Sequence, residues 1–170
     1  MDDNSKIDSS RQLSRLFNYA CFYLKFRLRS KKEVTNYLRK KTKNWNNPTS
    51  LIDATIKHLE EIGLINDLNF IAWLVRSRTA VKSKGEKAIR IELKRFGVNN
   101  DLVDQYFSQN PVDDQDSALR LLSKSWQRFS ELPEKIRFQK AIQFLLRRGY
   151  SFSCAKEAYN QVRESEVDNT

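Results

Sequence analysis

Residues 84–97 read KGEKAIRIELKRFG, and this stretch carries the pattern on which the fold prediction rests. Ile89, Leu93 and Phe96 recur at intervals of three or four residues and therefore share one face of an α-helix. Gly97 follows the last apolar residue, in the position where a glycine commonly ends a helix. The stretch predicts an amphipathic helix from Glu86 to Phe96.

The same pattern occurs three times in the chain of 170 residues. Leu38, Leu93 and Leu145 take equivalent places in their helices, 55 and 52 residues apart, and Gly97 and Gly149 each follow four residues later. A period of about 50 residues is typical of arrays in which each unit buries part of its surface against the next unit. Helices of similar length could match by coincidence, but the recurrence of the closing glycines favours a repeat.

The apolar periodicity and the turn residues divide the chain further. We expect three tandem three-helix repeats at residues 12–63, 66–108 and 114–163, after a disordered tail over residues 1–11 and before a polar C-terminal tail over residues 164–170. Ser30 and Glu33 have the spacing of a capping box, and Asn66 and Asp67 are expected to cap the helix that opens the second repeat.

Composition points to the same fold class. Four glycines and three prolines are fewer than an antiparallel β-protein needs for its turns. Hydrophobic residues make up 39% of the chain and charged residues 31%, which indicates a modest core and a large exposed surface. The predicted fold is therefore all-α, an elongated array of three tandem three-helix repeats.

The composition also excludes several classes of protein. No apolar run is long enough to span a bilayer and the N-terminus is polar, so we expect no membrane contact and a cytoplasmic location. Cys21 and Cys154 form neither a disulfide framework nor a zinc motif, and His58 is the only histidine. No glycine-rich phosphate loop is present. We expect no catalytic residue, no metal site, no cofactor and no enzyme activity.

The formal net charge is +10, from 31 basic and 21 acidic residues, and the basic residues form stripes. Any one stripe could be a solvated face, but three stripes on equivalent helices indicate an anionic partner, because like charges otherwise repel each other. Nucleic-acid phosphates and an acidic protein groove both fit. The candidate contact residues are Lys87, Arg90 and Lys94, which lie within ~60° of one another opposite the apolar face, then Lys140 and Arg147, then Arg29, Lys31 and Lys32.

Four segments resemble motifs of the RecX family of regulatory proteins. They are residues 29–34 (RSKKEV), 58–67 (HLEEIGLIND) with Phe70 shortly after, 84–98 (KGEKAIRIELKRFGV) and 144–151 (FLLRRGYS). The similarity covers about residues 14–162, with the motifs in the family's order and spacing. The chain departs from the family pattern at Asn66, where an aspartate is usual, and in a longer loop at residues 45–49 that lacks the family's glycine.

The resemblance implies an all-helical molecule without enzyme activity. Members of this family modulate the RecA recombinase, mostly by inhibiting it, in recombination, DNA repair and the SOS response. They bind the RecA–DNA filament and reduce its ATPase and strand-exchange activity, and some bind single- or double-stranded DNA directly. The same role, as a monomer, is the expectation for this chain.

A stand-alone, non-sequence-specific DNA-binding helical protein is the alternative. It is suggested by the isoelectric point of about 9.7 and by helix triplets that could present one helix to a groove of DNA. The basic stripes contain few Asn or Gln residues to read base edges, which disfavours sequence-specific binding. Asp67, Gly63, Gly97 and Gly149 are expected to be structural, as caps and turns.

Overall fold

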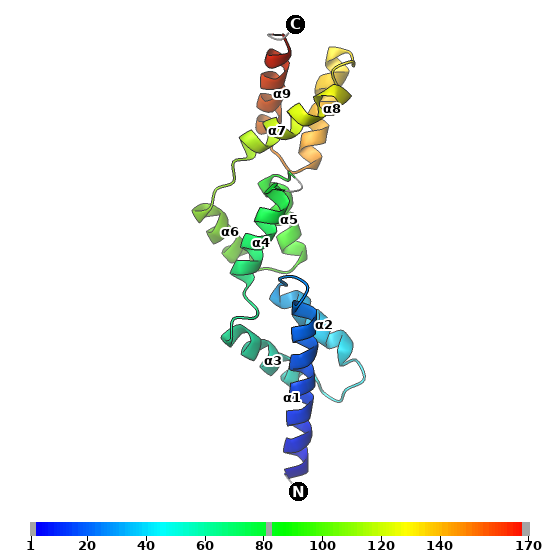
Figure 1. Cartoon of the computed structure of the whole chain (residues 1–170), viewed down its shortest axis with the longest axis vertical. Coiled ribbons are helices and arrows are strands. Elements are labelled where there is room, and N and C mark those ends of the chain that lie inside the picture. Colours follow the sequence, from blue (N-terminus) through cyan, green and yellow to red (C-terminus); the bar gives the residue numbers. More distant parts are fainter. Residues whose placement is uncertain (1–2, 81–82, 168–170) are drawn as a thin grey trace. The chain divides into compact units, whose positions relative to one another are not determined.

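The computed structural model describes residues 3–80 and 83–167, and these residues form nine α-helices, one 3₁₀ turn and no strand (Figure 1). The prediction of an all-α fold is confirmed. No helix in the described ranges combines the length and the apolar character needed to cross a membrane. The helices are α1 (Asp3–Leu24), α2 (Lys31–Lys41), α3 (Thr49–Glu61), α4 (Asp67–Ala80), α5 (Glu86–Arg95), α6 (Asn100–Gln109), α7 (Asp114–Ser125), α8 (Glu134–Arg147) and α9 (Phe152–Val167), with the 3₁₀ turn at Trp126–Arg128.

The chain divides into two compact units. The first unit contains the residues up to Trp73 together with Lys94–Leu102, and the second contains Leu74–Leu93 together with the residues from Val103 onward. The division passes through α4 and α5, so each unit holds one complete three-helix bundle and part of the middle triplet.

The first unit is organised around the bundle of α1, α2 and α3, which pack against one another. Each helix contributes apolar residues spaced four apart, which is the spacing that places them on one face. The buried residues are Leu16 and Ala20 of α1, Val34 and Leu38 of α2, and Ile52, Ile56 and Leu59 of α3. The buried hydroxyls of Thr42 and Thr55 donate to carbonyl oxygens one turn earlier, so neither is left without a partner.

Helix α1 begins at Asp3, so the predicted disordered tail over residues 1–11 is wrong for residues 3–11; residues 1 and 2 lie outside the described residues. The sequence argument required apolar periodicity, which this segment lacks. Once Leu16 and Ala20 anchor α1, each residue added at its N-terminal end gains one hydrogen bond without a new nucleation cost. Side-chain bonds one turn apart, such as Gln12 to Asp8, add to this extension.

The second unit is organised around α7, α8 and α9, whose ribbons lie close together in Figure 1. Its core combines small residues with large aromatic ones, and Tyr150 and Tyr159 are almost fully buried. Helix α9 continues to Val167, so the predicted tail from residue 164 is wrong for residues 164–167; residues 168–170 lie outside the described residues. Ion pairs from Arg163 to Glu134 and from Glu166 to Arg137 fasten its last turns to α8.

The predicted caps and turns are confirmed at several positions. Ser30 and Glu33 form a reciprocal capping box at the start of α2. Gly63, Gly97 and Gly149 have φ angles of 73°, 73° and 91°, in the left-handed region that favours glycine after a helix. These glycines end α3, α5 and α8 at the positions that the sequence pattern predicts.

Candidate functional site: basic surfaces and the joints that position them

In the first unit, the start of α2 is joined to the end of α5. The hydroxyl of Ser30 donates to the carbonyl oxygen of Phe96 at 2.7 Å and accepts the amide N–H of Glu33 at 3.2 Å. The carboxylate of Asp67 accepts the amide N–H of Lys31, the first residue of α2, at 2.8 Å. Amide groups that a helix start leaves unpaired are therefore satisfied here by two other segments of the unit.

In the second unit, the start of α5 is joined to the end of α8 in the same way. The amide N–H of Gly85 donates to the carbonyl oxygen of Arg148 at 2.9 Å. The carboxylate of Asp114 accepts the amide N–H of Glu86, the first residue of α5, at 3.1 and 3.2 Å. We call these two contacts the α2–α5 joint and the α5–α8 joint.

A pair of polar residues supplies the acceptor in each joint. The first residue of each pair caps its own helix: Asn66 accepts the amide N–H of Asn69, and Asp113 accepts that of Asp116, each at 3.0 Å. The second residue, Asp67 or Asp114, caps the middle helix of the preceding triplet. The sequence assigned Asp67 to the cap of its own helix, and the structure corrects this, because the partner amide is 36 residues away in the chain.

Burial governs the electrostatics of the two joint carboxylates. Burial raises the pKa of Asp67 above its ordinary value, although the amide hydrogen bond from Lys31 acts in the opposite direction. Burial likewise raises the pKa of Asp114, with the hydrogen bond from Glu86 opposing it and the negative charges of Glu86 and Asp113 reinforcing it. Each joint thus holds a carboxylate whose charged form is penalised by its surroundings.

The three candidate residues near Ser30 belong largely to the first joint. Arg29 has only 16% of its side chain exposed, pairs with Glu33, and lies over the ring of Tyr23 at 4.1 Å. Lys31 is exposed and pairs with Glu60 at 3.0 Å. Lys32 lies with its aliphatic stem against Gly97, where a Cβ atom would meet it. The structure gives these cations structural contacts that the sequence did not predict.

On α5, the structure separates one candidate residue from the other two. Lys87 and Lys94 are exposed. Arg90, which the sequence places with them on the outer face, is half-buried instead: it pairs with Glu86 at 2.6 Å and with Asp104 of α6, and its guanidinium lies 4.4 Å from the ring centre of Phe107. The prediction of an outward, unpaired Arg90 is wrong, because carboxylates one turn earlier and on α6 neutralise it.

Helix α8 brings its two candidate residues together in a groove of about 390 Å³. Lys140 and Arg147 are exposed on its rim with Gln143, and Arg128 of the 3₁₀ turn joins them. The floor is apolar and consists of Phe129, Leu132 and Phe144. Among the described residues, no ion pair neutralises any of the three cations. We call this surface the α8 groove.

Arg128 was missed by sequence reasoning. It lies outside the regular helices, so no periodicity placed it beside Lys140 and Arg147. Its guanidinium lies 5.9 and 5.7 Å from the ring centres of Phe129 and Phe144, which holds it over the groove floor. The adjoining Arg128-Phe129 pair of residues is the only local signal, and it becomes informative only when the fold of α8 is known.

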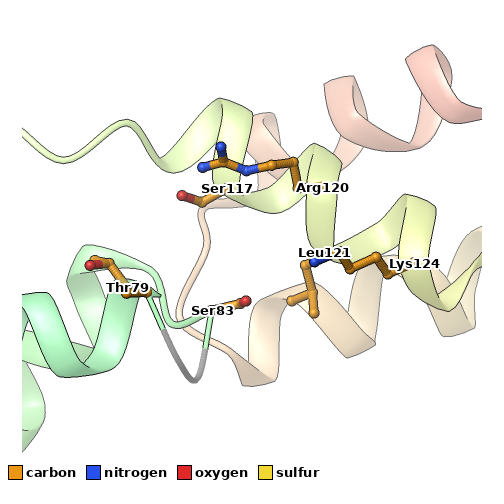
Figure 2. A pocket seen from close by; sticks show the side chains of 7 residues that line it. Thr79, Ser83, Ser117, Arg120, Leu121 and Lys124 are labelled. Atoms are coloured by element: carbon orange, nitrogen blue, oxygen red, sulfur yellow. The ribbon is translucent and has the colours of Figure 1, made fainter.

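A second cavity of about 340 Å³ lies between the end of α4 and α7 (Figure 2). Three hydroxyl residues and two cations line it: Thr79, Ser83, Ser117, Arg120 and Lys124, with Leu121 beside them. Arg120 also pairs with Asp116 at 2.7 Å, which offsets part of the positive charge. The sequence did not predict this cavity.

The thiol of Cys154 does not resemble a catalytic nucleophile. It is half-buried beside the backbone of α7, and its sulfur donates to the carbonyl oxygen of Asp114 at 3.3 Å. Burial raises the pKa of Cys154 to about 11, which is the opposite of the shift that activates a thiol. The groups that this structure exposes are binding groups.

Fold and surfaces together define the class: an all-helical protein of tandem three-helix units that presents unpaired cations beside apolar surface. Two family models match the chain, "RecX, second three-helix domain" at residues 66–106 and "RecX, third three-helix domain" at residues 113–159. The chain belongs to the RecX family, as the resemblance in its motifs predicted.

Individual relatives extend the comparison over nearly the whole chain. The regulatory protein RecX of Bacillus pumilus is 32% identical over 158 residues, covering 89% of this chain and 57% of its own length. That of Bacillus cytotoxicus is 30% identical over 164 residues, covering 94% of this chain and 58% of its own. The chain thus spans little more than half the length of these relatives. The crystal structure of RecX from Lactobacillus salivarius is similar with a TM-score of 0.78 and 25% identity, covering 91% of this chain and 98% of that one.

Proposed function

We propose that this protein binds the RecA–DNA filament and regulates RecA, mostly by inhibiting its ATPase and strand-exchange activity in recombination and repair. In this proposal it acts in the cytoplasm as a monomer, by binding alone and without catalysis or a cofactor. Membership of a family of regulatory proteins supports the proposal. The observation that carries it is the α8 groove, where Arg128, Lys140 and Arg147 present unpaired positive charge.

Electrostatics explains why such a groove favours an anionic partner. Three like charges near one concave surface repel one another, and no described carboxylate offsets them. An acidic protein surface or a row of phosphates removes that repulsion on binding, and complementary potentials also speed association. The exposed Lys87 and Lys94 of α5 are the further candidates for such contacts.

A protein polymer is a suitable partner for weak contacts of this kind. Each exposed cation contributes little alone, because solvent and salt screen it. When several weak contacts engage neighbouring subunits at once, the later ones form intramolecularly and the overall affinity rises steeply. A regulator of a filament therefore does not need a deep specific pocket.

The test is the ATPase activity of RecA on single-stranded DNA, titrated with this protein at two salt concentrations. We expect inhibition by the natural chain, and at least about a tenfold loss of potency when Arg128, Lys140 and Arg147 are all changed to Glu. The matched control changes three exposed lysines outside the groove, Lys57, Lys135 and Lys156, to Glu, which alters net charge equally. No inhibition by the natural chain over a wide titration would contradict the proposal. Equal loss in both variants would remove the groove from it.

Stand-alone DNA binding is the second candidate function, and the cavity of Figure 2 favours it. Hydroxyl groups together with Arg and Lys side chains are the usual contacts to DNA phosphates, and this cavity gathers both kinds. This function predicts duplex binding without RecA that weakens steeply with salt, and little effect on RecA ATPase when DNA is in excess. Changing Lys124 to Glu should weaken such binding more than changing Lys156 to Glu.

A further inference from the structure

The outer face of α1 exposes aromatic and basic residues that the bundle does not use. Phe22 and Phe26 are 63% and 69% exposed, more than any other large apolar side chain described. Lys25 lies between them in the chain, and its amide N–H still donates to the carbonyl oxygen of Cys21, so helical geometry continues to the end of this face. The face comprises Arg11, Arg15, Asn18, Phe22, Lys25 and Phe26, all exposed and within ~100° of one another around the helix.

These phenylalanines have no part in the core of the first unit. The buried side of α1 consists of Leu16 and Ala20, with Tyr19 and Tyr23 packed against the core. Phe22 and Phe26 contact each other, with ring centres 5.4 Å apart and planes at 82°, so they meet edge to face. Two adjacent exposed rings are unfavourable in water, and such a patch commonly marks a binding surface.

A nearby aromatic cluster shows what an occupied surface looks like in the same unit. Tyr23 is stacked on Tyr37 with ring centres 4.1 Å apart, and the guanidinium of Arg29 lies over the Tyr23 ring at the same distance. Lys41 lies over Tyr37 at 5.5 Å. The rings of this cluster are covered by partners within the chain. Among the described contacts, Phe22 and Phe26 have only each other.

We propose that this face of α1 binds single-stranded nucleic acid directly, with bases stacked on Phe22 and Phe26 and phosphates on Arg11, Arg15 and Lys25. Aromatic rings combined with cations are the chemistry that recognises unpaired bases on a charged backbone. Residues 11–26 contain no acidic residue, so nothing on this face opposes a phosphate. The face is about 22 Å long at the helical rise, which suits a short segment of a few nucleotides.

Other occupants fit this face less well. A duplex keeps its bases paired and offers only its phosphates, which leaves both rings exposed. A second copy of the chain would bring the same cations against one another. An acidic protein would satisfy the cations, but a convex helix face without a groove offers it no pocket for an anchor; the experiment distinguishes this occupant. The site does not depend on the filament role proposed above.

The test is fluorescence anisotropy of a labelled oligothymidine strand of about 15 nucleotides with the full chain and without RecA. Changing both Phe22 and Phe26 to Ala should weaken binding about tenfold or more, since each stacked base contributes substantially. The dependence on salt should be unchanged, because no cation is removed. The control is Phe152→Ala, which removes a 55% exposed ring from the start of α9 and should bind as the natural chain does. Helix content from circular dichroism should be the same in all variants.

A second variant separates the two kinds of contact. Changing Arg11 and Lys25 to Gln should weaken binding and also reduce the salt slope by about two, one for each lost phosphate contact. Unchanged affinity in the double phenylalanine variant, or an equal loss in the Phe152→Ala control, overturns the proposal. Unchanged strand binding together with a lost effect on RecA ATPase also overturns it and assigns the face to a protein partner. Absence of RecA inhibition in the natural chain leaves this measurement unaffected.

Discussion

The α2–α5 joint and the α5–α8 joint share one backbone plan but differ in how closely the chain segments approach. In the α2–α5 joint, Ser30 links the helix end through its hydroxyl, and Gly97 faces the flexible side chain of Lys32. In the α5–α8 joint, glycine replaces the capping serine. A Cβ atom on Gly85 would lie 2.7 Å from the carbonyl oxygen of Gly149, and one on Gly149 would lie 2.5 Å from the amide nitrogen of Ala88.

This difference shows two physical solutions to the same requirement. A side-chain cap tolerates small displacements, because a hydroxyl and a lysine stem can rotate. A direct backbone contact leaves no such freedom, because neither partner can move without disturbing its helix. We therefore expect the α5–α8 joint to be the more sensitive to substitution, and the predictions below test that ranking.

The largest effect is expected for Gly149→Ala. Its φ of 91° is unfavourable for a residue with a Cβ atom, and that atom would overlap the first turn of α5. Together these costs should lower the free energy of unfolding by about 3 kcal/mol or more, measured by urea denaturation.

Two other glycines provide the matched controls for Gly149→Ala. Gly63→Ala has a similar backbone strain but open space around the new atom, so about 1 kcal/mol is expected. Gly97→Ala should fall between them, because Lys32 can move aside. Equal costs at all three positions would show that backbone strain alone matters and that the close approach does not.

A smaller effect is expected from removing the joint carboxylates. Asp114→Ala leaves the first amide of α5 without its side-chain acceptor, and Gly85 offers no replacement, so a loss of about 2 kcal/mol is expected. Asp67→Ala should cost about 1 kcal/mol, because Ser30 and Glu33 continue to cap α2. The measurement is the urea midpoint for each variant, and the reverse order would contradict the ranking of the joints.

The pH dependence of Asp114 follows from its raised pKa. The folded chain binds a proton at Asp114 more tightly than the unfolded chain, so the resulting stability is present below about pH 3.8 and is lost as pH rises through the raised value. Asp114→Asn keeps an acceptor oxygen but does not titrate. The stability of the natural chain relative to this variant should therefore rise as pH falls from neutral.

Glu92 provides an opposite case within the second unit. Although burial acts against it, hydrogen bonds from Lys84 and Arg78 lower the pKa of Glu92 below its ordinary 4.5. Its contribution is therefore present above the ordinary pKa and is lost as pH falls through the lowered value. Urea denaturation of Asp114→Asn and Glu92→Gln across this range should show relative stabilities that drift in opposite directions. A common direction would contradict the two assignments.

The smallest effect is expected for Lys31→Gln. The ion pair from Lys31 to Glu60 is exposed on both sides, and such pairs contribute about 0.5 kcal/mol or less. The amide of Lys31 keeps its bond to Asp67 whatever the side chain is. A urea midpoint close to that of the natural chain is expected, and a large loss would place the strength of the α2–α5 joint in side-chain charge rather than in its backbone contacts.

Local patterns predicted most of the helices and several of their ends. The capping box of Ser30 and Glu33 and the closing glycines at 63, 97 and 149 act within a few residues of themselves, so their spacing is enough to identify them. The helical start of α1 was not predicted, because its support comes from the anchored part of the helix rather than from its own composition.

The candidate site was only partly predictable. Lys140 and Arg147 were found from their spacing on one helix, whereas Arg128 reaches them through a turn that has no period. Arg90 was misplaced because helical geometry shows which face a residue occupies but not which carboxylates approach that face. The role of Asp67 was misassigned for a similar reason, since its partner is distant in the chain.

The amino-acid sequence by itself determined the all-helical class, the threefold recurrence of an amphipathic helix with its closing glycine, and the excess of positive charge. These depend on periodicity and on residue chemistry, which act between near neighbours. Only the tertiary structure decided which cations are neutralised, which aspartate caps which helix, and which aromatic rings remain uncovered. Those outcomes depend on contacts between residues far apart in the chain, and no local pattern encodes such distances.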